Sequence, residues 1–223
     1  VVTRQWATLN PRAVMFSPDT NPFGGPITVQ DVLEARLIAW PLTLFHCCLV
    51  TDHGGAVIVA RPEIAKSLRT NPVWIAGAGE SMAHANMLEM EDFTATSASR
   101  SSATAYEMAG LGPDDMEMAM IYDSFTYTVL ATIEALGFCE PGEGADFVAY
   151  QRTAPGGDFP MNTSGGGLSY THSGMYGMFL VLEAVRQLRG ETGERQLENP
   201  KIAIVNGTGG YLSSTGTAIL AID

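Results

Sequence analysis

The sequence predicts a layered α/β fold, and three observations support this. Hydrophobic residues make up 46% and charged residues 16% of the 223 residues, which is typical of a packed globular protein. Segments with strand patterns alternate along the chain with segments that have helical patterns. No short repeat or low-complexity tract interrupts this alternation. The length suits one large domain or two small ones.

The first part of the chain carries few regular signals. Residues 1–27 contain four prolines and a Gly-Gly pair, so we expect an irregular surface segment without a core of its own. A helix is predicted over 27–40, with Thr28 as its N-cap. Residues 46–60 read as two strands around a glycine-containing turn, and 62–70 read as a helix that begins at a proline.

The pattern is clearer from residue 71 onward. The clearest helix is 175–190, which is apolar on one face, carries Arg186 and Arg189 in its last turns and stops at Gly190. The other predicted elements are a strand at 73–80, a helix at 97–112, a strand at 116–125, a helix at 126–138 and two strands within 201–223.

The overall charge excludes several classes of partner. A net charge of −12 argues against nucleic acid and against anionic membranes. No apolar run reaches membrane-spanning length, and the start VVTRQWATLN lacks the basic-then-apolar form of a signal peptide. The three cysteines make no disulfide framework. We therefore expect a cytoplasmic protein.

No metal site is expected from the histidines and cysteines. His46 and His53 flank the predicted hairpin with no third ligand nearby, so a structural role is favoured. Cys47 and Cys48 lie inside a predicted apolar strand, and Cys139 ends a predicted helix. All three thiols are expected to be inert.

Three loops carry the candidate chemistry. Each lies at the end of a predicted strand or the start of a predicted helix, where α/β proteins gather functional groups. Their glycines let backbone N–H groups face a ligand and form an oxyanion hole. The loops are YDSF at 122–125, NTSGGGLSYTHSGMYG at 162–177 and NGTGG at 206–210.

His172 is the candidate base within the second loop. The positive end of the following helix lowers the proton affinity of an imidazole at this place, and a neutral imidazole is what a general base needs. The spacing alone favours a capping or packing histidine over a catalytic one. His84, in a loop after a predicted strand, is either an ordinary loop residue or a site-lining one.

These three loops resemble the motifs of the thiolase superfamily. NTSGGGLSYTHSGMYG is similar to the N-x-x-G-G-x-x-x-x-G-H-P-x-G loop, with Asn162, Gly165, Gly166 and His172 at matching offsets. YDSF, ahead of a helix ending LGFC, resembles the H-D-C-F motif of sterol-carrier-protein-x type thiolases. GTGGYLSS resembles the terminal C-x-G-G-G loop. LNPRAVMF and CCLVTDHGGAVIVA resemble segments from the middle of such proteins.

The resemblance implies a thiolase-like α/β/α fold with a mixed sheet flanked by helices. The family builds two similar halves around its active site. Residues 1–70 resemble the substrate loop and last strands of the first half, and 71–223 resemble a complete C-terminal domain. The nucleophilic cysteine of the family belongs to the first half. We expect the apolar surface left by that half to drive formation of a dimer or a complex with another chain.

The resemblance also implies roles for individual residues. His172 corresponds to the base and oxyanion donor, Tyr122 to the oxyanion-side residue, and Gly209 to the residue that offers a backbone N–H. No cofactor is implied, since coenzyme A belongs to the substrate. The implied substrate-binding residues are Asn162, Gly165, Gly166, Tyr170, Asp123, Phe125 and His84.

Three functions follow from the resemblance. The first is an acyl-CoA acyltransferase of lipid metabolism, acting on fatty acid or steroid 3-ketoacyl-CoA. However, Gly207 stands where the family has its second cysteine, and Ser173 replaces the proline after the histidine. The second is a retro-aldolase acting on hydroxyacyl-CoA, which uses tyrosines and a zinc-ribbon/OB-fold partner; Tyr122, Tyr170 and Tyr176 suit it. The third is a non-catalytic acyl-CoA or lipid carrier.

Overall fold

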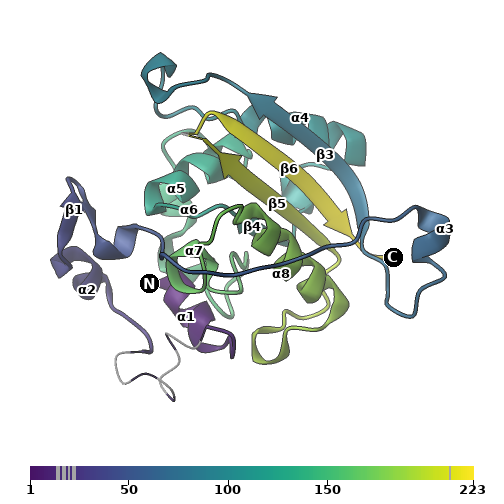
Figure 1. Ribbon diagram of the computed structural model, residues 1–223. Helices are drawn as coiled ribbons and strands as arrows, with labels where there is room; N and C mark the ends of the chain where they lie inside the picture. Colours follow the sequence, from purple (N-terminus) through teal and green to yellow (C-terminus); the bar gives the residue numbers. More distant parts are fainter. Residues whose placement is uncertain (14–15, 17–18, 20, 22–23, 211) are drawn as a thin grey trace.

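A four-stranded mixed sheet forms the centre of the protein. The computed structural model describes residues 1–13, 16, 19, 21, 24–210 and 212–223. The strands lie in the order β3-β6-β5-β4, with β4 parallel to β5 and the other two pairs antiparallel (Figure 1). Their bounds are β3 Trp74–Met82, β4 Met118–Ile121, β5 Ile202–Gly209 and β6 Ser214–Ala221.

Helices cover both faces of this sheet. Helix α4 (Ala98–Ala109) packs on β3 and β6, and α8 (Gly177–Arg189) packs on the opposite face against β5 and β4. Helix α5 (Thr126–Ala135) lies next to α4. The predicted α/β/α layers with a mixed sheet are therefore confirmed.

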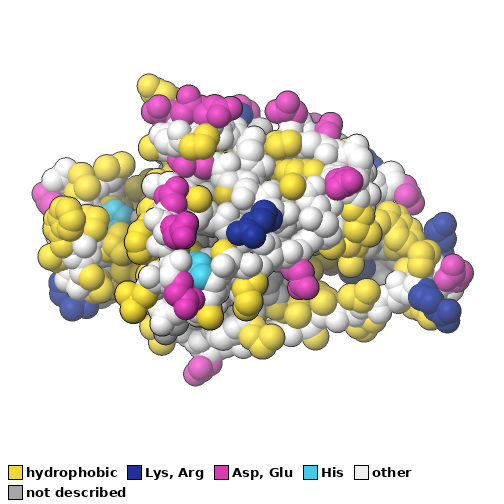
Figure 2. Space-filling model, turned by 90° about the horizontal axis from the view of Figure 1, so that it is seen from above, with side chains coloured by type: hydrophobic (Ala, Val, Ile, Leu, Met, Phe, Trp, Pro, Cys, Tyr) yellow, Lys and Arg dark blue, Asp and Glu magenta, His cyan; other side chains and the backbone are white. Residues whose placement is uncertain are grey.

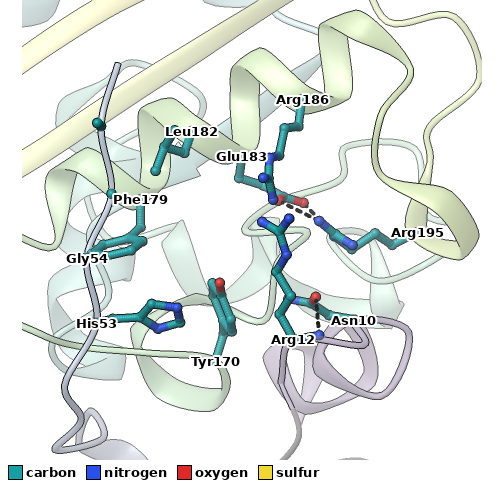
Figure 3. A pocket seen from close by; sticks show the side chains of 12 residues that line it. Asn10, Arg12, His53, Gly54, Tyr170, Phe179, Leu182, Glu183, Arg186 and Arg195 are labelled. Carbon is teal, nitrogen blue, oxygen red and sulfur yellow. Dashed lines mark hydrogen bonds and ion pairs between the residues drawn. The ribbon is translucent and has the colours of Figure 1, made fainter. Parts of the chain in front are cut away.

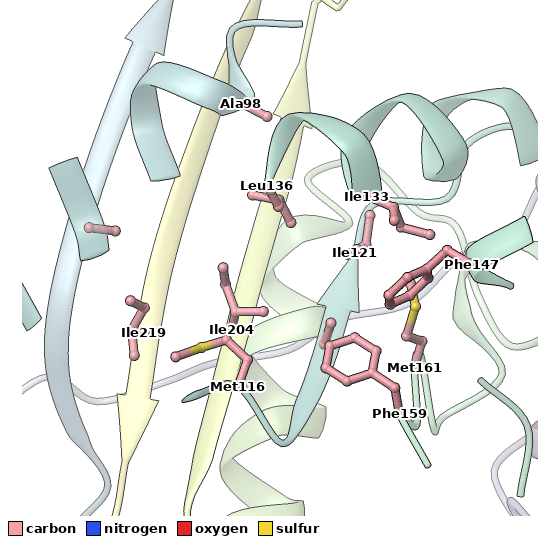
Figure 4. Packing of buried hydrophobic residues seen from close by; sticks show 12 residues of the cluster. Ala98, Met116, Ile121, Ile133, Leu136, Phe147, Phe159, Met161, Ile204 and Ile219 are labelled. Atoms are coloured by element: carbon pink, nitrogen blue, oxygen red, sulfur yellow. The ribbon is translucent and has the colours of Figure 1, made fainter. Parts of the chain in front are cut away.

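Each face of the sheet has its own hydrophobic core. On the α4 side, Ile121, Ile204 and Ile219 are fully buried (Figure 4). On the α8 side, Met118 and Met120 pack with side chains of the helix. The whole of β4 is buried, which is why its sequence MAMI is continuously apolar rather than alternating.

The elements predicted after residue 71 are confirmed with shifted ends. The strand expected over 116–125 is shorter because the chain turns at Asp123 into α5. Gly110 and Gly190 end α4 and α8 in the left-handed conformation. The remaining short elements are α6 Gly144–Phe147, α7 Gly166–Ser169, and the 3₁₀ turns Met87–Glu89, Pro113–Asp115, Ala149–Gln151 and Gly193–Arg195.

The expectation of an irregular surface segment at 1–27 is wrong for residues 2–8. Helix α1 (Val2–Thr8) begins the chain, and Trp6 is only 2% exposed. The indole of Trp6 donates a hydrogen bond to the Thr153 carbonyl at 3.0 Å. Tertiary packing therefore holds this helix. Residues 14, 15, 17, 18, 20, 22 and 23, including two of the prolines, lie outside the described residues.

Two predicted helices of the first part are too long. Thr28 caps α2 as expected, but α2 spans only Val29–Glu34. Strand β1 (Leu37–Ala39) follows and pairs with β2 (Leu42–Thr43). The predicted helix does not extend to residue 40, because Pro41 disfavours the helical conformation at the residue before it. A 3₁₀ turn at Leu44–His46 comes next. The helix expected over 62–70 is the single turn α3, Pro62–Ala65.

The hairpin predicted over 46–60 is wrong, because no strand forms there. The backbone of this segment bonds to loops instead of to a neighbouring strand. The Cys48 N–H donates to the Ser124 carbonyl at 2.8 Å, and the Leu49 N–H donates to the Gly167 carbonyl at 3.0 Å. We call residues 47–60 the strap, because they run as extended chain in front of the sheet and α8 (Figure 1).

Apolar side chains are exposed mainly on the first part of the chain. Figure 2 shows hydrophobic side chains gathered on the projecting lobe of α2, β1 and β2. Trp40 in this lobe is 85% exposed, and Val50 in the strap is 99% exposed. Among the residues that the structure describes, no helix is long and apolar enough to cross a membrane.

Candidate functional site

Three aromatic rings meet where β4 ends and α8 begins. Tyr122 follows β4 directly, His172 precedes α8, and Tyr176 is the N-cap of α8. The Tyr122 and His172 rings are edge to face with centroids 5.3 Å apart, and His172 stacks on Tyr176 at 5.1 Å. The ring centroids of Tyr122 and Tyr176 are 5.2 Å apart. We call Tyr122, His172 and Tyr176 the aromatic triad.

The aromatic triad carries polar atoms without partners. Within the described part of the chain, His172 Nε2 and the Tyr176 hydroxyl are buried and make no hydrogen bond. The Ser173 hydroxyl, beside His172, and Asn206 Oδ1, in the neighbouring strand β5, are in the same condition. Buried polar atoms of folded proteins are nearly always hydrogen-bonded, so such a group of orphans is suited to receiving a polar ligand.

Burial keeps the aromatic triad uncharged at neutral pH. It lowers the pKa of His172, which favours the neutral imidazole. It raises the pKa of Tyr122, with smaller contributions from Cys48 and Asp123, and raises the pKa of Tyr176 well above its ordinary value. The site therefore combines a neutral base with protonated phenols, which is chemically suited to acid–base catalysis.

Asp123 lies beneath the aromatic triad and anchors the loop that carries His172. Its carboxylate is fully buried and accepts hydrogen bonds from the Gly167 N–H at 2.7 Å and the Leu168 N–H at 3.1 Å. Burial raises the pKa of Asp123 to about 7, and the two backbone donors oppose the shift. The Tyr176 hydroxyl lies near the same carboxylate, outside normal hydrogen-bond geometry.

The glycines of the NTSGGGL loop make this anchoring possible. Gly166 has a φ of +67°, and a Cβ on it would lie 2.1 Å from Asp123 Oδ2. A Cβ on Gly167 would lie 2.7 Å from His172 Cδ2. Side chains at either position would push the carboxylate or the imidazole away, so the loop requires glycine.

Asn162 and Gly165, two predicted substrate-binding residues, hold the loop in place. The Asn162 amide accepts from the Ile121 N–H and donates to the Ile121 carbonyl, both at 2.8 Å. Both ends of the amide are thus occupied by the end of β4. Gly165 lies against Ala7 of α1. Contact of either residue with a substrate remains a prediction.

The strap supports the loop from the other side. The Thr51 hydroxyl accepts from the His172 N–H at 3.0 Å and is 2.7 Å from the Thr171 hydroxyl. The Thr171 hydroxyl is also 3.0 Å from His53 Nδ1. The sequence could not show this chain, because its members are 118 to 121 residues apart and follow no local pattern.

The other predicted site residues lie at varied distances from the aromatic triad. Phe125 pairs its backbone with Cys47 and is 40% exposed. Gly209 ends β5 beside the Ser214 side chain. His84 follows β3, in the segment that bonds to the β5–β6 turn. Tyr170 lines a separate pocket described below. The roles assigned to all four remain predictions.

Cys48 lies closer to the site than the sequence indicated. The strand expected to bury it does not form, and its thiol is near Tyr122 and Asp123. Burial, followed by the Asp123 charge, raises the pKa of Cys48, so the thiol stays protonated. In the described residues, no group of three or more His, Cys, Asp and Glu side chains could hold a metal ion.

Comparison with known proteins places this site within a family. Residues 79–222 match the family model "Thiolase C-terminal domain-like". The whole chain is 32% identical to an acetyl-CoA acetyltransferase of Methanothermobacter thermautotrophicus, of which it covers 56%. Over 94% of its length, it is 34% identical to the steroid side-chain-cleaving aldolase of Thermomonospora curvata, of which it covers 52%.

A solved structure gives the same result. The Ltp2–ChsH2(DUF35) aldolase superposes on the whole chain with a TM-score of 0.89 and 33% identity, and the chain covers 56% of it. The chain thus spans about half the length of these relatives. It belongs to the thiolase-like family that includes acetyltransferases and thiolase-like aldolases.

Proposed function

We propose that this protein cleaves a carbon–carbon bond in a hydroxyacyl-CoA by a retro-aldol reaction. The observation that carries the proposal is the contact of the neutral imidazole of His172 with the phenols of Tyr122 and Tyr176. A base and an acid next to each other are what the two proton transfers of this reaction need. The similarity to two aldolases supports the same choice.

The proposed reaction uses the aromatic triad as follows. His172 Nε2 takes the proton from the β-hydroxyl, and the oxygen forms a ketone as the bond between the α and β carbons breaks. The electrons of that bond form an enolate on the thioester. The Tyr122 hydroxyl donates a hydrogen bond to the enolate oxygen, where negative charge grows. The His172 imidazolium returns its proton to the α carbon, which gives the shortened acyl-CoA and the neutral ketone.

Cysteine chemistry suits this site less well. Gly207 occupies the position of the second thiolase cysteine, and a Cβ on it would be 3.8 Å from Gly177, at the start of α8. The nearby thiol of Cys48 is held protonated by burial and by Asp123, which makes it a poor nucleophile.

Acyl transfer is the second candidate function. The similarity to an acetyl-CoA acetyltransferase over the whole chain favours it. In that reaction, His172 would activate a cysteine outside this sequence or the thiol of Cys48. The carrier hypothesis differs from both, because it expects binding of acyl-CoA without turnover.

The proposal includes partners and location. We propose a DUF35-type partner, meaning a small protein with a zinc ribbon and an OB fold, because a similar aldolase is named for such an assembly. The exposed apolar side chains on the lobe of α2, β1 and β2 suit a dimer or this partner. We also propose a cytoplasmic location.

The test is product analysis with two substrates. The active form of the protein is given a 3-hydroxyacyl-CoA with a tertiary hydroxyl, or a 3-ketoacyl-CoA together with free CoA. The proposal predicts a ketone and a shortened acyl-CoA from the first and no thiolysis of the second. Tyr122→Phe should lower the lyase rate by about 10² to 10⁴, and Cys48→Ser should leave it unchanged. Thiolysis that is abolished by Cys48→Ser would favour acyl transfer, and tight binding without either product would favour a carrier.

A further inference from the structure

A pocket lies between the segment after α1, the strap and α8, and Phe179 in its wall stacks on Tyr176 of the aromatic triad. Its volume is about 200 Å³. This is several times the roughly 30 Å³ share of one water molecule and below the roughly 300 Å³ at which sites for drug-sized ligands begin. The hollow therefore suits a small ligand or one small group of a larger ligand.

Two arginines make this pocket positively charged. Arg12 comes from the segment after α1, and Arg186 from the last turn of α8; both side chains point into the pocket (Figure 3). Neither forms an ion pair within the described part of the chain. In a protein with a net charge of −12, two adjacent unpaired guanidinium groups concentrate positive charge at one place.

The acidic residue of the pocket does not cancel this charge. Glu183 accepts two hydrogen bonds from Arg195, at 2.9 and 3.0 Å, and one from the Thr163 hydroxyl at 2.7 Å. Both members of this ion pair are only 5% exposed. Because Arg195 already neutralises Glu183, the charges of Arg12 and Arg186 stay uncompensated.

A phenol, an imidazole and a phenyl ring complete the wall. The Tyr170 hydroxyl reaches the side of the pocket where Arg12 lies (Figure 3). His53 uses Nδ1 on Thr171, which leaves Nε2 as the nitrogen available to a ligand. Phe179 supplies an apolar surface, and its ring centroid lies 5.2 Å from that of His53.

We propose that this pocket binds a phosphate group. A carboxylate has two oxygens, and one guanidinium fork already pairs with both of them. Two forks and a phenol offer more donors than that, and the three free oxygens of a phosphate monoester or the four of inorganic phosphate can accept them. This proposed phosphate site is independent of the reaction that the aromatic triad catalyses.

The test is calorimetric titration of the 223-residue protein with sodium phosphate at low ionic strength, where screening is weak. Saturable binding of one phosphate per chain is expected, with acetate binding at least tenfold more weakly. Arg12→Met and Arg186→Met should each weaken phosphate binding by about tenfold or more, because each removes a charge-assisted pair of hydrogen bonds. Arg186→Lys, which keeps the charge without the fork, should fall between.

Arg100→Ala is the matched control. This exposed arginine of α4 uses no side-chain hydrogen bond in the described structure, so its loss removes the same charge far from the pocket. Phosphate binding should be unchanged. The proposal is overturned if wild type shows no saturable binding, if acetate binds as well as phosphate, or if the Arg100 and Arg186 variants lose affinity equally. Circular dichroism checks that the variants are folded.

A second arm identifies the source of the phosphate. Adenosine 3′,5′-bisphosphate is titrated beside inorganic phosphate in wild type and in Arg12→Met. Tighter binding of the nucleotide that depends on Arg12 would support a phosphate site for the nucleotide end of a coenzyme. Equal or weaker binding would support a site for free phosphate. Nucleotide binding that is unchanged in Arg12→Met would contradict the proposed pocket.

Discussion

The two parts of the chain on either side of residue 70 differ in how they use apolar residues. After residue 70, the sheet buries Met118, Ile121 and Ile204 completely. Before it, Trp40 and Ile58 are 85% and 92% exposed. The later part therefore contains a closed core of its own, and most of the earlier part lies outside it.

The difference shows how the site is divided. The later part supplies every member of the aromatic triad and the carboxylate beneath it. The strap, from the earlier part, supplies the backbone and hydroxyl groups that hold the His172 loop. The proposed catalytic groups thus lie at the β4 edge of the sheet, and they are supported by a segment with little packing of its own, apart from its contacts with α8.

The largest difference in stability between the two parts is expected when one isoleucine in each part is truncated to alanine. Ile204→Ala should lower the free energy of unfolding by about 2 to 5 kcal/mol, because it leaves a cavity in a fully buried core. Ile58→Ala, in the exposed strap, should change it by no more than about 0.5 kcal/mol. Urea denaturation of both variants measures this. Similar losses for the two would show that the strap is packed as tightly as the sheet.

The same division explains how much the sequence could predict. The elements after residue 70 carry local sequence signals. Helix α8, for example, has an apolar face, basic residues in its last turn and a glycine stop, and each of these signals can be recognised from the sequence alone. Helix α1 depends on Trp6 reaching Thr153, a contact that spans 147 residues. No local pattern shows such a contact. The strap has an apolar sequence that predicts strands. It forms none because no neighbouring strand pairs with it.

The site follows the same rule. The motifs brought Tyr122 and His172 together correctly as neighbours, because both lie where an element of the sheet layer begins or ends. Tyr176 as a member of the triad, and the support from Thr51, needed the structure. The Arg12–Arg186 pocket also could not be predicted, since its residues come from five separate segments.

A smaller effect is expected where the two parts are joined. Thr171→Val keeps the shape of a fully buried side chain and removes the hydroxyl that contacts Thr51 and His53. The free energy of unfolding should fall by about 1 to 3 kcal/mol, since buried partners lose their hydrogen bonds. Thr104→Val, on the exposed side of α4, is the control and should cost less than about 0.5 kcal/mol. Equal losses would mean that the strap does not support the loop.

A pH dependence of stability is also expected within the later part. The pKa of Asp123 is raised from 3.8 to about 7 in the folded protein, so the folded state holds the proton more tightly than the unfolded state. Its contribution to stability is present below pH 3.8 and is lost as the pH rises to about 7. Asp123→Asn should flatten the decline of the urea midpoint between pH 4.5 and about 7. An unchanged slope would assign that decline to other groups.

The proposed chemical role of His172 and a packing role predict different results for one variant. His172→Ala should lower turnover of the hydroxyacyl-CoA by about 10² to 10⁴ in the active form of the protein, because a general base is lost. The melting temperature should stay close to that of wild type, since the ring is only half buried and its Nε2 has no partner in the described structure. Turnover and melting temperature are measured on the same preparation. A clearly lowered melting temperature together with near-normal turnover would contradict the account and leave His172 a structural role alone.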